Sequence, residues 1–108
     1  MIYELRVYEC YGGRLPALHE RFSRHTLSLF DRHGIRSVGY WTTDVGGSSN
    51  ELTYLLAFED QGQRELAWRA FKADPEWQRV KAESERDGLL VRAIHNQILV
   101  PTDYSPLR

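Results

Sequence analysis

Residues 52–58 read Leu-Thr-Tyr-Leu-Leu-Ala-Phe, a nearly unbroken apolar run with the length of one β-strand. Alternate side chains of a strand point to opposite faces. The two faces hold Leu52, Tyr54, Leu56 and Phe58 on one side and Leu55 and Ala57 on the other. Apolar side chains on both faces are typical of a strand that is covered on both sides. We therefore expect both faces of this strand to be buried.

The segments around this run alternate between strand and helix patterns. β-formers and period-two alternation predict three further strands, over residues 2–8, 37–43 and 91–100. Helical spacing of apolar residues predicts helices over about residues 15–33, 61–72 and 74–86. The order strand, helix, strand, strand, helix, strand, with one extra helix, is the split βαβ pattern. We predict an α+β fold of ferredoxin-like βαββαβ type, with residues 1–108 as a single domain.

The helix patterns also predict which side chains face the sheet. In the first helix the expected apolar face holds Leu15, Leu18, Phe22, Leu29 and His33. In the second helix the residues expected to face inward are Leu66, Ala67, Ala70 and Phe71. The third helix should begin at Asp74-Pro75, because Asp is a good N-cap and Pro a good first helical residue.

The second apolar face of strand 52–58 predicts a partner. A ferredoxin-like sheet normally packs helices on one face only, so a monomer would leave Leu55, Ala57 and their neighbours exposed to water. Exposed apolar area of that size usually marks an interface. We expect a homodimer in which two sheets pack face to face.

Composition excludes several classes of protein. The formal net charge is -1 over 108 residues, without the basic excess that a nucleic-acid-binding protein usually shows. No run of eighteen apolar residues is present, so we expect no membrane span. The N-terminus starts with a strand pattern rather than a signal peptide, and the single Cys10 excludes an intrachain disulfide. A cytoplasmic location is the default expectation.

Four short motifs occur in order along nearly the whole chain. They are Ile2-Tyr3-Glu4-Leu5-Arg6, Gly39-Tyr40-Trp41-Thr42, Asp74-Pro75-Glu76-Trp77, and Ile98-Leu99-Val100-Pro101 followed by Tyr104-Ser105-Pro106-Leu107. Together they resemble NIPSNAP domains. The resemblance implies a dimeric α/β barrel, a group that includes cofactor-independent monooxygenases, haem-degrading enzymes, isomerases and lyases. It supplies no agreed catalytic motif, so no catalytic residue is carried over from the family.

Glu4 and Arg6 share one face of the first strand, which is central in this topology. Central strands rarely carry two charges on one face unless the charges are paired or line a cavity. A buried ion pair is the favoured interpretation, and an Arg6 that binds a substrate carboxylate is the alternative. His95 lies on the last strand, next to the first, and could approach either charge. The other interpretation places His95 on a solvent-facing edge.

The histidines of the first helix, His19, His25 and His33, are six and eight residues apart. Metal-binding pairs on helices are usually three or four apart, so we expect no metal site. His25 lies at the margin of the apolar face and is the candidate acid or base, because histidine titrates near neutral pH. Cys10 has no base beside it, and no nucleotide or flavin motif occurs. We expect no bound cofactor.

These candidates converge on one predicted cavity between the first helix and the sheet. The catalytic candidates are His25, Arg6 and His95, with His25 at the mouth, and the substrate-binding candidates are Tyr40, Trp41 and Tyr54. Tyr40 and Trp41 point to opposite faces, so one of them should lie in the dimer interface instead. The chain has thirteen aromatic residues, more than a core of this size needs, and a cavity with aromatic walls suits a flat, apolar ligand.

Two functional hypotheses follow from these residues. The first is a small-molecule-binding protein that acts as a cofactor-independent monooxygenase, isomerase or cyclase on an aromatic or polyketide-like substrate. The second is a non-catalytic binding or scaffolding dimer. Convergence of His25, Arg6 and His95 in a closed cavity favours the enzyme, and their exposure to solvent favours the binding protein.

Overall fold

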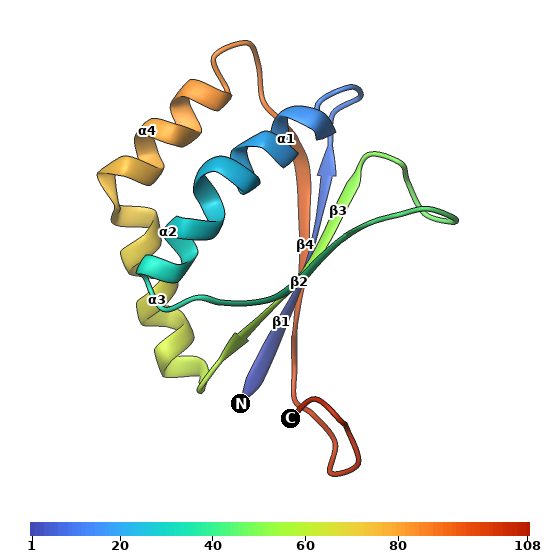
Figure 1. Cartoon of the computed structure of the whole chain (residues 1–108), viewed down its shortest axis with the longest axis vertical. Helices are drawn as coiled ribbons and strands as arrows, with labels where there is room; N and C mark the ends of the chain where they lie inside the picture. The colour runs from blue at the N-terminus through green and yellow to red at the C-terminus, as the bar shows by residue number, and fades with distance from the viewer.

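The computed structural model describes all residues from 1 to 108 and contains one four-stranded antiparallel sheet with four helices on one face (Figure 1). The strands are β1 (Ile2–Cys10), β2 (Arg36–Thr42), β3 (Glu51–Phe58) and β4 (Val91–Leu99). Their order across the sheet is β2-β3-β1-β4, so β1 and β3 are central. This confirms the predicted ferredoxin-like α+β fold, with strand ends within about two residues of the predicted ones.

The three predicted helices begin within about one residue of their predicted starts, and the first is divided into two parts. The helices are α1 (Leu15–Arg21), α2 (Leu27–Arg32), α3 (Gln61–Ala73) and α4 (Pro75–Ser84). Asp60 caps α3 by accepting a hydrogen bond from the Gln63 backbone, and Asp74 caps α4 by accepting one from the Glu76 backbone, each at 2.8 Å. The predicted start of the last helix at Asp74-Pro75 is thus confirmed.

The first helix is not regular along its length. A π-helical turn over Phe22–Thr26 joins α1 to α2, and the Thr26 hydroxyl donates to the carbonyl of Arg21, five residues earlier, at 3.3 Å. This wider turn changes which residue faces the sheet. Thr26 is buried and His25 is half-buried, although His25 follows Leu18 by seven residues, nearly two turns of a regular α-helix.

The core lies between the helices and the sheet. The face of β3 with Leu52, Tyr54, Leu56 and Phe58 packs against Leu18, Phe22, Leu29 and Phe30 of the first helix and against Ala67, Trp68 and Phe71 of α3. The predicted inward positions Leu66 and Ala70 are wrong. Leu66 is 63% exposed and Ala70 is exposed, because Trp68 turns toward the sheet and its indole donates to Glu4 at 2.9 Å.

His33 is not in the middle of the apolar face of the first helix, as its spacing from Leu15 predicted. It is the C-terminal cap of α2, and its Nε2 lies 2.7 Å from a carboxylate oxygen of Asp74. Gly34 follows with a φ of +75°, the left-handed conformation expected after a helix end. His33 and Asp74 therefore tie the end of α2 to the start of α4.

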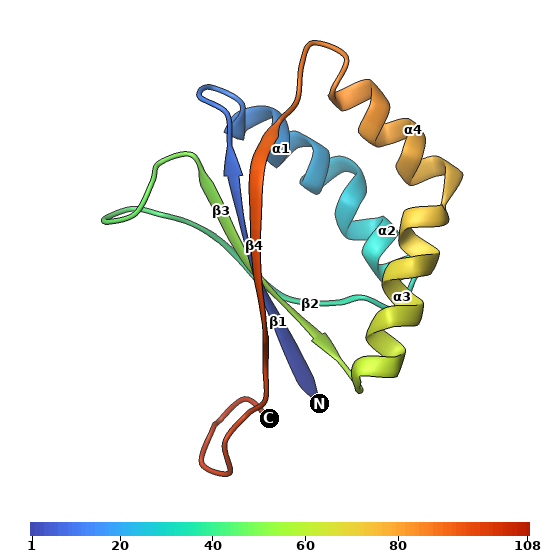
Figure 2. The ribbon, with the colours of Figure 1, turned by 180° about the vertical axis from the view of Figure 1, so that it is seen from behind.

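The other face of the sheet carries no helix, as the view from behind also shows (Figure 2). The strand register places Leu5, Val7 and Leu55 on this face, where they are half-buried. Trp41 is 53% exposed there, and its ring lies so close over Gly39 that a Cβ at Gly39 would come within 2.5 Å of it. The C-terminal tail brings Leu107 next to Tyr3 at one end of this face. None of the helices is both long and apolar enough to cross a lipid bilayer.

Candidate functional site

Glu4 lies on the central strand β1 and is completely buried on the helix-facing side of the sheet. Its carboxylate accepts five hydrogen bonds from four side chains. The donors are Arg6 Nη1 at 2.8 Å, Arg64 Nε at 2.8 Å and Nη2 at 3.1 Å, Trp68 Nε1 at 2.9 Å and Asn96 Nδ2 at 3.0 Å. A buried carboxylate with this many donors has its hydrogen-bonding capacity filled.

These donors decide the charge of Glu4. Burial by itself would raise the pKa of the Glu4 carboxyl, but the hydrogen bonds from Arg64, Asn96, Trp68 and Arg6 outweigh burial and lower the pKa to about 2. Glu4 is therefore ionised at neutral pH, and the predicted buried ion pair with Arg6 is present in the structure.

Arg6 connects this ion pair to two phenols. Its Nε donates to the Tyr54 hydroxyl at 2.8 Å and its Nη2 donates to the Tyr8 hydroxyl at 3.2 Å. The guanidinium carbon lies 4.6 Å from the centre of the Trp68 ring, a cation–π contact. Burial alone would lower the pKa of Arg6, but Tyr8, Tyr54 and Glu4 outweigh it and raise the pKa. The side chain keeps 13% exposure, where it meets a cleft.

That cleft lies between helices α3 and α4 and strands β1 and β4, with a volume of about 650 Å³. Aromatic and cationic side chains dominate its lining. The rings are Tyr8, Trp68, Phe71 and Trp77, and the cations are Arg6, Arg21, Lys72, Lys81 and Arg92. Glu85 is the single carboxylate among the lining residues. The volume is in the range of small-molecule sites.

Arg21, near the π-helical turn, is a buried cation without a counter-ion. Only 6% of the residue is exposed, its Nη1 donates to the Ser84 hydroxyl at 3.1 Å, and its Nε has no partner. The guanidinium carbon lies 5.1 Å from the centre of the Trp77 ring. Burial lowers the pKa of Arg21, against the opposing effect of Tyr8 and Glu85, but an arginine stays charged.

Sequence reasoning missed Arg21, although a signal existed. Arg21 follows Leu18 by three residues and precedes Phe22, so it shares their side of the helix. A charge within an apolar helix face is the same kind of anomaly that singled out Glu4 and Arg6 on the first strand.

His95 does not meet Glu4 or Arg6. Strand register pairs Arg6 with Asn96 and Val7 with His95, so His95 points to the uncovered face of the sheet. There its Nε2 lies 2.6 Å from a carboxylate oxygen of Glu9. Asn96, the adjacent residue with the opposite orientation, supplies the contact to Glu4 instead. The predicted approach of His95 to the Glu4–Arg6 pair is therefore wrong.

His25 is also separate from Arg6. It borders a smaller polar cleft of about 370 Å³ between α1 and α4, because the π-helical turn directs Thr26 rather than His25 toward the sheet. The three catalytic candidates of the sequence analysis thus lie in three different environments. Nor do three or more His, Cys, Asp or Glu side chains form a group that could hold a metal ion.

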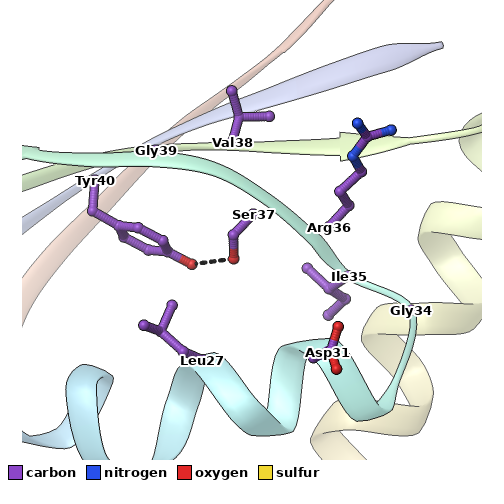
Figure 3. Close-up of a pocket in the computed structure, with 9 residues that line it drawn as sticks. All are labelled: Leu27, Asp31, Gly34, Ile35, Arg36, Ser37, Val38, Gly39 and Tyr40. Atoms are coloured by element: carbon purple, nitrogen blue, oxygen red, sulfur yellow. Dashed lines mark hydrogen bonds between the residues drawn. The ribbon is translucent and has the colours of Figure 1, made fainter.

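The predicted substrate-binding rings lie away from the main cleft. Tyr54 is fully buried, and Tyr40 stacks on it with ring centres 5.2 Å apart. Phe22 packs edge-on against both rings, so the space between the first helix and the centre of the sheet is filled. Figure 3 shows Tyr40 on β2 bonded to Ser37 at 2.7 Å, beside a more open pocket between α2 and β2. Trp41 points to the uncovered face, and the predicted divergence of Tyr40 and Trp41 is confirmed.

Comparison with known sequences gives a family. The NIPSNAP family model matches residues 3–106 of the chain. The curated mouse (Mus musculus) protein NipSnap homolog 3B is 28% identical over 76 residues, which are 70% of this chain and 30% of the mouse protein. The matched region is thus less than one third of that relative's length.

Solved structures agree with this result. A NIPSNAP family protein of unknown function from Agrobacterium tumefaciens is 29% identical with a TM-score of 0.87, covering 100% of this chain and 94% of that one. A NIPSNAP domain protein from Burkholderia xenovorans is 24% identical with a TM-score of 0.85, covering 98% and 99%. SnoaB, a cofactor-independent oxygenase from Streptomyces nogalater, shares the fold at 14% identity and a TM-score of 0.59, covering 97% and 96%.

Proposed function

The chain belongs to the NIPSNAP family, and we propose that it binds a flat small organic molecule in the cleft between α3, α4, β1 and β4. The observation that carries this proposal is the composition of the cleft wall. Trp68, Phe71 and Trp77 supply ring surfaces, and Arg6 supplies a cation held in place by Glu4. Aromatic walls with a few fixed polar groups are typical of small-molecule sites.

We propose that the ligand is an aromatic or polyketide-like substrate of a cofactor-independent reaction. Oxygenases, isomerases and cyclases of this kind share a first step, in which a proton leaves an activated substrate carbon or hydroxyl. Glu85 is the carboxylate in the cleft that can accept this proton. The negative charge then develops on a substrate oxygen, where Arg6 and the Tyr8 hydroxyl can stabilise it. The fold that the chain shares with a cofactor-independent oxygenase supports this reaction class.

A binding protein without turnover is the second candidate, and two observations favour it. None of the four histidines lines the cleft. Glu85 lies 3.7 Å from the ammonium of Lys81, so the single carboxylate of the cleft already has a counter-ion within the protein. The same cleft would then bind its ligand without catalysing a reaction.

We also propose that the protein is a homodimer that buries the uncovered face of the sheet. Trp41 is 53% exposed, and Val38 and Leu99 are exposed on the same face. Replacing Trp41 by Glu should place a charge in this interface and give a monomer in sedimentation equilibrium. Leu66→Glu, on the outer surface of α3, is the matched control and should leave the dimer intact. A wild-type monomer at micromolar concentration would contradict the proposal.

The binding proposal is tested with N-phenyl-1-naphthylamine, a neutral probe whose fluorescence rises in an apolar site. Trp77→Leu should weaken its binding by about tenfold, because the ring that it removes lines the cleft. Trp41→Leu makes the same change on the opposite face of the sheet and should leave binding unchanged. Equal effects of the two substitutions would show that the probe binds elsewhere.

Turnover is tested separately from binding. Aromatic and polyketide-like substrates are incubated with the wild type and with Glu85→Gln in air, and products and oxygen uptake are measured. The reaction proposed here requires turnover by the wild type and its loss in the variant, with binding of the neutral probe retained. Unchanged turnover in Glu85→Gln would remove Glu85 as the base, and binding without turnover of any substrate would favour the second candidate.

A further inference from the structure

We infer that the ligand of this cleft is an organic anion whose carboxylate lies against Arg21 while its flat body lies on the aromatic wall. This inference rests on the proposed binding cleft and adds the chemical class of its ligand. It assigns to Arg21 the recognition of the acid group.

The cations of the cleft differ in whether they form an ion pair with a carboxylate of the protein. Arg6 pairs with Glu4 at 2.8 Å, Arg92 with Glu9 at 2.8 Å and Lys81 with Glu85 at 3.7 Å. Arg21 forms no ion pair and a single hydrogen bond, to the neutral hydroxyl of Ser84. Lys72 has no ion pair either, but it is exposed to water, whereas Arg21 is buried. Buried charges are normally paired, because removing an ion from water is unfavourable by several kcal/mol. A bound anion would supply the missing counter-charge.

The hydrogen bonding of Arg21 leads to the same conclusion. A guanidinium has five N–H donors, and one of those of Arg21 is used. Its Nε is buried and has no acceptor within the protein. Carboxylates accept two parallel hydrogen bonds from a guanidinium, which makes them the anion that arginine binds best along with phosphate. A carboxylate beside Arg21 would satisfy donors that the fold leaves unsatisfied.

The rings beside Arg21 favour a flat body for the anion. Trp77 lies against the guanidinium, with its ring centre 5.1 Å from the guanidinium carbon, and packs on Phe71 with ring centres 4.6 Å apart. Both rings line the cleft together with Trp68. A flat apolar group attached to the acid would therefore lie on aromatic surface next to the charge, where stacking adds to the affinity.

Arg21 also lines the smaller cleft between α1 and α4, together with Arg14, Arg24 and Arg86, and the Nε of Arg14 is likewise buried without an acceptor. This cleft is nevertheless less suited to an aromatic anion. Three carboxylates, those of Glu20, Glu83 and Asp87, line that cleft and would repel a negative ligand. Arg24, another of its cations, already pairs with Glu20 at 3.3 Å. No Phe, Tyr or Trp side chain lines it. An aromatic acid is therefore expected on the sheet side of Arg21.

The test compares two fluorescent probes with one ring system. 8-Anilinonaphthalene-1-sulfonate carries an oxyanion, and N-phenyl-1-naphthylamine lacks it. The wild type should bind the sulfonate at least about tenfold more tightly than the amine. Arg21→Met should remove most of this preference and leave the neutral amine bound. Arg24→Met, which removes an exposed cation of the same helical segment, should change neither affinity.

A competition experiment addresses the carboxylate itself. 1-Naphthoate should displace the sulfonate probe from the wild type, and its neutral analogue 1-naphthamide should not. Arg21→Gln, which keeps a hydrogen-bond donor but carries no charge, replaces Arg21→Met if that variant does not fold. Either variant should lose displacement by 1-naphthoate.

The outcomes separate the two proposals. If the wild type binds neither probe in the cleft, the proposed binding function is wrong. Two results would overturn the assignment of Arg21 and leave the binding proposal intact. The first is equal binding of both probes by the wild type, and the second is a preference for the anion that persists after the Arg21 charge is removed. Displacement by 1-naphthamide as effective as that by 1-naphthoate would also overturn it.

Discussion

Glu4 and Arg21 are two buried charges on the same side of the sheet, and the protein treats them in opposite ways. Glu4 accepts five hydrogen bonds and pairs with Arg6 and Arg64. Arg21 donates one hydrogen bond to a neutral hydroxyl and pairs with no carboxylate. Both side chains are at least nine-tenths buried.

The difference separates a structural charge from a candidate binding charge. A carboxylate whose acceptor sites are filled has little capacity left for a ligand, and its network joins β1, β4 and α3. A cation with unused donors can still bind the acceptors of a ligand. Its removal from water is unfavourable, and no ion pair within the protein offsets this cost. The four substitutions or conditions below test this contrast, from the largest expected effect to the smallest.

Replacing Glu4 by Gln should have the largest effect on stability. The variant leaves Arg6 and Arg64 without their shared counter-ion, and breaking a buried ion pair lowers the free energy of unfolding by about 3–5 kcal/mol. Urea unfolding followed by tryptophan fluorescence measures this change. Glu20→Gln, in an exposed pair with Arg24, is the control, with an expected loss below about 1 kcal/mol. A loss of that small size for Glu4→Gln would contradict the structural role.

Acid should remove the contribution of Glu4 over a defined pH range. Its pKa falls from an unfolded value of 4.5 to about 2 in the folded protein, so the folded state binds this proton less readily than the unfolded state. The stabilisation is full above pH 4.5 and is lost as the pH falls toward about 2, with a total of about 3 kcal/mol. The stability difference between the wild type and Glu4→Gln should therefore narrow in acid. A difference that is independent of pH would refute this linkage.

Arg6→Met should lower the free energy of unfolding by about 2 kcal/mol, less than Glu4→Gln. The carboxylate of Glu4 keeps its bonds from Arg64, Trp68 and Asn96, so its charge remains compensated. The hydroxyls of Tyr8 and Tyr54 lose a charged donor. The same urea titration measures the loss. An effect as large as that of Glu4→Gln would identify Arg6 as the principal partner.

Arg21→Met should have the smallest effect, within about 1 kcal/mol of the wild type. The substitution removes an unpaired buried charge, which is favourable, and a contact with Trp77, which is unfavourable. The change in the free energy of unfolding can be compared directly with that of Arg6→Met, because both variants replace a largely buried Arg by Met. A destabilisation equal to that of Arg6→Met would mean that Arg21 supports the fold, and the contrast with Glu4 would disappear.

Local patterns predicted the elements of the fold, and long-range contacts decided the site. The apolar run over residues 52–58 and the cap at Asp74-Pro75 lie within single elements, so their structure follows from nearby residues. Of the four partners of Glu4, only Arg6 is close in the sequence. Arg64, Trp68 and Asn96 are 60, 64 and 92 residues away. Strand alternation places Asn96 on the same face of β4 as Ile94 and Ile98, and His95 on the other, but it does not say which residues of β1 and α3 will meet Asn96.

The homodimer, the ligand and the roles of Arg6, Tyr8 and Glu85 remain proposals, because they depend on partners outside the chain. The predicted cavity is absent over the centre of the sheet for a packing reason. Phe22, Tyr40 and Tyr54 fill the space between the first helix and the central strands with ring-to-ring contacts. Open space remains between α2 and β2 at the sheet edge, and beneath α3 and α4, where the rings of Trp68 and Trp77 form a wall.

The π-helical turn over Phe22–Thr26 suggests how the interior of this fold can change between relatives. In an alignment, such a turn corresponds to a single inserted residue within a helix. A relative without the insertion would keep a regular α-helix through this segment, and its residue equivalent to His25, rather than Thr26, would face the sheet. One insertion or deletion could therefore exchange a threonine for a titratable imidazole in the interior while every strand keeps its place. Relatives that differ in length at this turn are where a divergence in chemistry within the same fold should be sought.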